Sequence, residues 1–241
     1  MAPPRNDMVE MATARANVYG LLADIFREEP SETLLSKLGA EEFSTALNAL
    51  NLSLDEMFES TSRVQLVEDL ALEFTRLFIG PGSHLSPHES MHVEPRFGEQ
   101  NSFWSEQTVE VKKFIEATGL EIDESFTGMP DHISAELEFM QRLTAKEAEA
   151  WKEPDEAFAA NIMKIEKRFL DEHLSQWAPR FCNRVIAQAE HSFYRCFADV
   201  MEGFLDFECE NLDAFIAQAE TGGAHLADAG RDASDAARVE V

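Results

Sequence analysis

The residues of this chain best suited to chemistry lie in the segment Met129-Pro-Asp-His-Ile-Ser-Ala-Glu136. It sets two carboxylates and an imidazole, from Asp131, Glu136 and His132, within two helical turns. A proline disfavours helix in the residue before it, so we predict that a helix begins here with Asp131 as its N-cap. The Asp131 carboxylate would then accept from free amides of the first turn, and His132 and Glu136 would share one helical face.

Three kinds of chemistry are open to these side chains. In the first, Asp131 only caps the helix, and His132 and Glu136 pair with each other or with backbone groups. In the second, they form a polar patch that holds the basic or amide groups of a partner and responds to pH near neutrality through His132. In the third, they bind a metal ion, which would need at least one further ligand because no H-E-x-x-H spacing is present.

Three histidines spaced by four residues, His84, His88 and His92, form a second candidate group. On a continuous helix their imidazoles would line one face and could hold zinc or nickel. Pro87 interrupts the run, however, and spacing without structural context is weak support for a metal site. There is also no G-x-S-x-G motif and no Gly-rich phosphate loop. We predict no metal, no cofactor and no catalytic residue, and keep a metal- or nucleotide-dependent hydrolase built from both groups as the alternative.

Bulk composition limits the kind of partner. The 241 residues carry a formal net charge of −26, which repels nucleic acid and anionic membranes and attracts cationic peptides. The same charge would also serve solubility or adaptation to a salty cytoplasm. Hydrophobic residues make up 44%, so the chain can bury a substantial core. The N-terminus lacks the pattern of a signal peptide, and no segment approaches the roughly 20 apolar residues that span a bilayer, so we expect a cytoplasmic protein.

The elements that must position these residues are all predicted to be helices. Apolar residues recur at helical spacing in nearly every segment, and no useful alternating strand pattern is present. In the first helix this stripe consists of Met11, Ala14, Val18, Leu21, Leu22 and Ile25. We predict an all-α, multi-helix bundle with an N-terminal part at about 8–119, a hinge at 120–130 and a C-terminal part at 131–219. Residues 220–241, rich in Gly, Ala and Asp, are predicted to form a disordered tail.

The segment Phe74-Thr-Arg-Leu-Phe-Ile-Gly-Pro81 is typical of an apolar helix end, stopped by Gly80 and Pro81. The spacing of Phe74 and Phe78 favours a place in the core. Together with Trp104, they could instead line an apolar groove, and the sequence does not separate the two.

At these motifs the chain resembles the TorD/DmsD family of redox-enzyme maturation chaperones. The family's aromatic-x-x-Leu-Phe-x-Gly-Pro motif is matched by Phe74, Leu77, Phe78, Gly80 and Pro81. Its Pro-x-Glu-Ser-like segment is matched by Pro87, Glu89 and Ser90. Its Pro-(x)-Asp-His-Ile/Leu-x-x-Glu-Leu motif is matched by Pro130, Asp131, His132, Ile133, Glu136 and Leu137. The resemblance runs over about residues 10–210 in the family's order.

The resemblance implies an all-helical cytoplasmic chaperone, not an enzyme. It would bind the twin-arginine signal peptide and the apo-form of a molybdenum- or tungsten-cofactor oxidoreductase, assist cofactor insertion and prevent premature export. It would work as a monomer or a domain-swapped homodimer, without nucleic acid or stable membrane insertion. An assembly subunit that stays in a membrane redox complex is a further alternative. The implied client-binding residues are Asp131, His132, Glu136, Phe74, Phe78, Gly80, Pro81, Glu89 and Trp104, and we expect an apolar, negatively ringed cleft beside them.

Overall fold

The computed structural model describes residues 4–40, 62–80, 84–93, 105–120, 128–153 and 156–236, with side chains up to residue 221. Within these ranges every regular element is a helix, which confirms the all-α prediction. The one β-type pairing recorded there is an isolated antiparallel bridge between His88 and His132. Within the same ranges, no helix has an apolar run of sufficient length to cross a bilayer.

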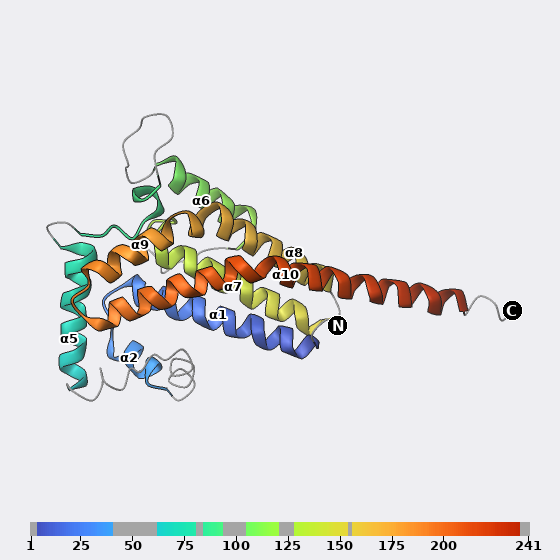
Figure 1. Cartoon of the computed structure of the whole chain (residues 1–241), viewed down its shortest axis with the longest axis horizontal. Helices are drawn as coiled ribbons and strands as arrows, with labels where there is room; N and C mark the ends of the chain where they lie inside the picture. The colour runs from blue at the N-terminus through green and yellow to red at the C-terminus, as the bar shows by residue number, and fades with distance from the viewer. Residues whose placement is uncertain are drawn as a thin grey trace.

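The long helices lie side by side, α5 crosses one end of the bundle, and α10 extends beyond the other end (Figure 1). Three short elements are not α-helical: η1 and η4 are π-helices and η2 is a 3-10 helix. In chain order the elements are α1 (Arg5–Arg27), α2 (Glu32–Leu38), α5 (Arg63–Phe74), η1 (Thr75–Ile79), η2 (Glu89–Met91), α6 (Glu106–Ala117), α7 (Ile133–Lys152), α8 (Glu156–Phe169), η4 (Leu170–Leu174), α9 (Ser175–Gln188) and α10 (Ser192–Ala236).

The centre of the bundle is the packing of α1 on α7, with α8, α9 and α10 completing the core. α1 contributes Tyr19, Leu22 and Phe26, each at most 2% exposed. Fully burying an apolar side chain of this size stabilises a fold by about 1.5–3 kcal/mol. Helices from both predicted parts of the chain therefore share one core. Most of the predicted hinge, residues 121–127, lies outside the described residues, so a division there stays a prediction.

The helix that carries Phe74 and Phe78 ends as the motif predicts, but through a π-helical turn. η1 closes with the Gly80 N–H donating to the Thr75 carbonyl at 2.6 Å. Phe74 and Phe78 are only 5% and 7% exposed, and their ring centroids lie 5.0 Å apart. Phe78 also packs on Phe181, with ring centroids 6.0 Å apart. Within the part of the chain that the structure describes, these two phenylalanines are therefore core residues.

At its C-terminal end, α10 stays helical to Ala236, past residue 220, where the sequence predicts a disordered tail. This part of α10 extends beyond the other helices (Figure 1). The alanines of this segment favour helix, whereas its glycines, on which the predicted tail partly rests, disfavour it.

Candidate functional site

Asp131 is fully buried just before α7, where it connects three segments. Its Oδ2 accepts from the Ser90 N–H at 3.2 Å and from the Thr108 hydroxyl at 3.1 Å. Its backbone carbonyl accepts from the Glu89 N–H at 2.9 Å. Asp131 thus fastens η2 and α6 to the start of α7.

The N-cap of α7 is His132, and the prediction that Asp131 caps this helix is wrong. The Nδ1 atom of His132 accepts from the Ser134 N–H at 3.2 Å. Ser90 and Thr108, from η2 and α6, occupy the Asp131 carboxylate that would otherwise face the first turn. A tertiary contact has therefore replaced the local cap.

His132 is also unsuited to respond to pH near neutrality, contrary to the expectation from its residue type. Burial, with smaller contributions from the charges of His88 and Arg27, lowers the pKa of His132 to about 3. Its ring packs edge-on against His88, with centroids 4.9 Å apart. A neutral imidazole that caps a helix is consistent with the helix dipole, which disfavours a cation at this end.

Replacing Asp131 by Ala should lower the free energy of unfolding by about 1–3 kcal/mol, because buried donors on Ser90 and Thr108 lose their acceptor. Asp131→Asn keeps one acceptor oxygen and should lose less. Thermal unfolding followed by circular dichroism measures both. A wild-type midpoint in Asp131→Ala would contradict this role.

The three spaced histidines do not converge. His84 is exposed, while the Nε2 atom of His92 lies 2.7 Å from the Ser86 carbonyl oxygen and its ring packs on Trp177. Across the part of the chain that the structure describes, no group of three His, Cys, Asp or Glu side chains is arranged to hold a metal ion. The hydrolase alternative therefore gains no support from the arrangement of these residues.

Beside the Asp131 turn, Glu89 and Glu136 form a buried pair of carboxyl groups within hydrogen-bonding reach of each other. The indole N–H of Trp177 donates to Glu136 Oε2 at 3.2 Å, and no N–H or O–H donor among the described residues reaches Glu136 Oε1. His173, in the π-helix η4, places Nδ1 at 3.0 and 3.3 Å from the two oxygens of Glu89. We call Glu89, Glu136 and His173 the carboxyl cluster.

Burial and mutual repulsion make this pair reluctant to ionise. Burial, and then the charge of Glu89, raise the pKa of Glu136 well above its usual value. Burial also raises the pKa of Glu89, although the His173 hydrogen bond opposes it. Two close carboxyl groups in an apolar setting cannot both be charged cheaply, which favours retention of one proton by the pair, on Glu136 rather than on Glu89.

A cleft of about 930 Å³ opens next to the carboxyl cluster, between α6, α8 and η4. Glu89 and His173 line its deepest part, since only 3% and 5% of these residues are exposed. Its apolar lining comes from Val93, Phe114 and Ile165. A hollow therefore opens beside the Asp131 turn and reaches it through Glu89, whereas Asp131, His132 and Glu136 do not line it.

The charges around the cleft are mixed, so the expected negative ring of acidic side chains is interrupted by basic ones. Basic side chains of Lys113, Lys164 and Arg168 line it together with the acidic side chains. Arg168 donates to Glu172 at 2.9 Å and lies over the Phe114 ring, 4.7 Å from its centroid.

Of the predicted site residues, the fold gathers Glu89, Asp131, His132 and Glu136 at this place. Phe74 and Phe78 lie in the aromatic core, which reaches the site only through contacts such as His92 on Phe181. Gly80 ends the π-helix after α5. Pro81 and Trp104 lie outside the described residues.

Sequence reasoning did not assign His173 or Trp177 to the site. Both lie in a segment of helical apolar spacing that reads as core. The sequence signal that could have assigned His173 to the site was its place at core spacing between Phe169 and Trp177, where a histidine is unusual.

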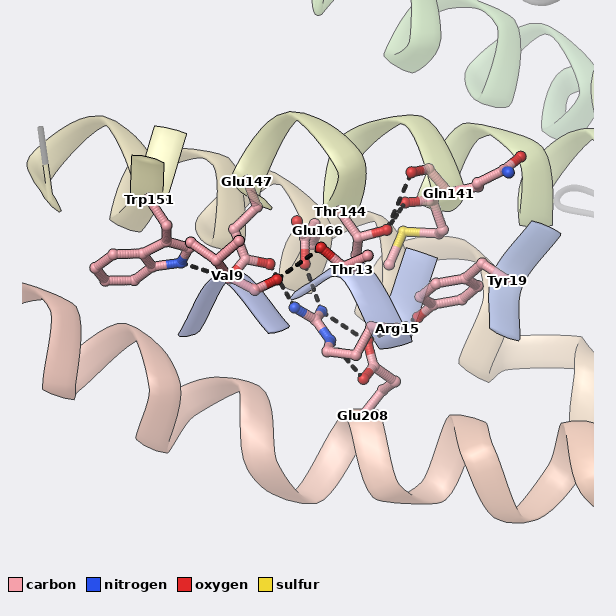
Figure 2. A network of polar contacts seen from close by, with 11 residues as sticks. Val9, Thr13, Arg15, Tyr19, Gln141, Thr144, Glu147, Trp151, Glu166 and Glu208 are labelled. Atoms are coloured by element: carbon pink, nitrogen blue, oxygen red, sulfur yellow. Dashed lines mark hydrogen bonds and ion pairs between the residues drawn. The ribbon is translucent and has the colours of Figure 1, made fainter. Parts of the chain in front are cut away.

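A second buried polar cluster, also missed, joins α1, α7, α8 and α10 (Figure 2). The Arg15 guanidinium donates to Glu147 and Glu166 at 2.5 Å each, and to the two oxygens of Glu208 at 2.8 and 2.7 Å. The Tyr19 hydroxyl donates to Glu208 at 3.0 Å. All these side chains are buried. We call Arg15, Glu147, Glu166 and Glu208 the Arg15 cluster.

One cation faces three carboxyl groups in this cluster, and the imbalance appears in their ionisation. Burial alone would lower the pKa of Arg15, but the charges of Glu166 and Glu208 outweigh it and raise that pKa well above its usual value. Burial raises the pKa of Glu166 to about 8, against the opposing charge of Arg15. The Arg15 cluster therefore holds a proton near neutral pH. The cluster lies inside the bundle, and none of its residues lines the cleft.

Comparison with known proteins gives a consistent picture. A family model described as nitrate reductase delta subunit matches residues 40–183, more than half of the chain. The chain is 25% identical over 211 residues to the chaperone protein TorD of Vibrio parahaemolyticus, covering 82% of this chain and 94% of that protein. It is 24% identical over 226 residues to the TorD of Shewanella loihica, covering 89% and 100%. It is 27% identical over 216 residues to a perchlorate reductase assembly chaperone protein of Dechloromonas aromatica, covering 86% and 93%.

Proposed function

Because this chain belongs to the family of the nitrate reductase delta subunit and the TorD chaperones, we propose that it binds the twin-arginine signal peptide and the apo-form of a molybdenum- or tungsten-cofactor oxidoreductase. The chain is a chaperone of redox-enzyme maturation and not an enzyme. In the proposal it acts in the cytoplasm, as a monomer or a domain-swapped homodimer. There it assists cofactor insertion and delays export of the client.

The observation that supports this most is the cleft beside the carboxyl cluster. Two of the sequence motifs, around Glu89 and around Asp131, meet at its inner end through the Glu89 N–H bond to the Asp131 carbonyl. Its apolar lining suits the hydrophobic stretch of a leader, and acidic groups lie nearby for the arginines.

Simple energetics permit the role. A net charge of −26 speeds encounters with a cationic leader, an effect that salt screens over a Debye length of about 8 Å at physiological ionic strength. Burying three or four large apolar side chains contributes roughly 1.5–3 kcal/mol each. Micromolar affinity needs only about 8 kcal/mol net after the costs of ordering the peptide.

We expect a synthetic twin-arginine leader to bind the full chain, and replacement of both arginines by alanine to weaken binding about tenfold or more. Isothermal titration calorimetry measures both affinities. Equal binding of the two peptides, or binding of neither, would reject specific leader recognition.

The place of binding is tested on α8 with a matched pair of substitutions. Ile165→Asn puts a polar group into the cleft lining, while Phe158→Asn makes the same kind of change at a residue that is 45% exposed and does not line the cleft. The cleft variant should bind the leader several-fold more weakly, and the control should match wild type. Equal loss in both would place binding elsewhere.

The assembly-subunit alternative has one observation in its favour, because the matching family description names a reductase subunit. Capture of the mature enzyme by the tagged chain would favour this alternative. Capture of the precursor alone would favour the chaperone.

A further inference from the structure

The carboxyl cluster has a property that leader binding in general does not require. It presents a buried acidic side chain, Glu89, at the inner end of an accessible cleft, and a second one, Glu136, directly behind it. Glu136 Oε1 is buried without a hydrogen-bond donor among the described residues. A buried carboxyl oxygen in this state is costly unless a proton or a cation reaches the pair.

We infer that Glu89 is the subsite for one guanidinium or ammonium group of the bound client segment, which takes the place of His173 and releases a proton from the Glu89–Glu136 pair to solvent. The inference rests on the proposed function, and it names the residue and the charge that the cleft recognises.

The cleft geometry supports entry of a cation at this point. His173 Nδ1 lies 3.0 and 3.3 Å from the two Glu89 oxygens, so both oxygens face one position, from which the two parallel N–H groups of a guanidinium could bind them. His173 belongs to the π-helix η4, a kind of segment that recurs at functional sites. An arriving guanidinium would therefore replace a hydrogen-bond donor of the same position and sense.

The resident cations of the cleft limit the subsite at Glu89 to one positive charge of the guest. Arg168 pairs with Glu172 at 2.9 Å, and Lys164 pairs with Glu220 at 2.6 Å, so neither neutralises Glu89. Their charges, with that of Lys113, nevertheless repel a second cation next to Glu89, so Glu89 receives only one of the two arginines. One arginine reaching Glu89 while the apolar stretch covers Phe114 and Ile165 satisfies both conditions.

Whether the Glu89–Glu136 pair keeps its proton depends on the polar and charged groups that face it. The groups that face the pair are Asp131 from the turn before α7, His173 from η4 and the indole N–H of Trp177 from α9. Asp131 adds negative charge to the two carboxyl groups, so without a guest the pair retains one proton. A cation at Glu89 stabilises the fully ionised pair, and the proton then leaves. Leader affinity should consequently increase with pH across the range in which the free pair still holds its proton.

Calorimetry on the full chain tests this with the synthetic twin-arginine leader, run at one pH in two buffers of different ionisation enthalpy. Wild type should release up to one proton per peptide. Glu89→Gln should weaken binding about tenfold or more, because a desolvated charge pair is lost. Glu116→Gln removes the same charge from α6, at a residue that does not line the cleft, and should change affinity less than about twofold.

Glu136→Gln tests proton release separately from the charge interaction at Glu89. An amide imitates the protonated carboxyl group and still accepts from Trp177. This variant should bind the leader within about threefold of wild type but release no proton. If Glu89→Gln does not fold, the comparison of proton release between wild type and Glu136→Gln is sufficient as the test. Unchanged proton release in Glu136→Gln, or equal affinities of Glu89→Gln and Glu116→Gln, would overturn the subsite.

A peptide with one arginine before a generic apolar stretch distinguishes this inference from the proposed function. Glu89-dependent binding of this peptide without any preference for the twin-arginine leader would support the subsite and reject leader specificity. Leader binding that needs both arginines but not Glu89 would support leader specificity and reject the subsite. Binding of neither peptide would reject both.

Discussion

Replacing Arg15 by Met will lower the free energy of unfolding by about 3–5 kcal/mol, the largest effect that we expect from a single substitution. Arg15 is 3% exposed and is the cation of the Arg15 cluster, bonded to Glu147, Glu166 and Glu208. Without it three buried carboxyl groups face one another, and they must take up protons or draw water into the bundle. The four helices that meet here, α1, α7, α8 and α10, lose their common contact.

Urea denaturation followed by circular dichroism measures the loss. In a chain of this size, the thermal midpoint should fall by about 10 °C, at roughly 2–4 °C per kcal/mol. Lys37→Met is the matched control, because the Lys37–Asp24 pair is about half exposed and such surface pairs contribute less than about 1 kcal/mol. Equal losses in the two variants would show that the Arg15 cluster does not hold the bundle together.

The Arg15 cluster also shows where sequence periodicity stops being sufficient. The first helix was predictable from its apolar spacing, and Leu21, Leu22 and Ile25 are buried as expected. Ala14, placed in the same stripe, is exposed, and its neighbour Arg15 is buried. Hydrophobicity alone could not show this, because Arg15 is tolerated inside only where carboxylates arrive from three distant helices.

The site was predictable in part for the same reason. The sequence brought Asp131, His132 and Glu136 together because they are neighbours on the chain. It placed Glu89 with them only through the family resemblance. It did not show that Asp131 bonds Ser90 and Thr108 instead of its own helix, since that choice depends on how η2 and α6 fold over the start of α7.

The two polar clusters share a physical feature that no local pattern records. Each contains more buried carboxyl groups than cations, and each resolves the excess with a proton. In the carboxyl cluster the proton lies next to a cleft, where a guest can displace it. In the Arg15 cluster it is enclosed by four helices, so it can affect only stability.

This enclosed proton gives the second large prediction, in which wild-type stability declines between about pH 5 and pH 8. Burial raises the pKa of Glu166 from its ordinary value of 4.5 to about 8. Between these values the folded chain holds a proton that the unfolded chain has lost, so stability decreases as pH increases and levels off above pH 8. This is opposite to the usual behaviour of a salt-bridged carboxylate. Each pH unit in this window is worth about 1.4 kcal/mol.

Glu166→Gln removes the titration while it keeps the size of the side chain and an acceptor for Arg15. Relative to wild type, its free energy of unfolding should increase by about 3 kcal/mol from pH 5.5 to pH 8, as measured by urea denaturation at each pH. Glu172→Gln, on the exposed side of η4, should follow the wild-type curve. Parallel curves for wild type and Glu166→Gln would mean that Glu166 is ionised in the folded chain. Arg15 would then have to balance three full negative charges without a proton, and the burial of all four side chains would no longer be explained.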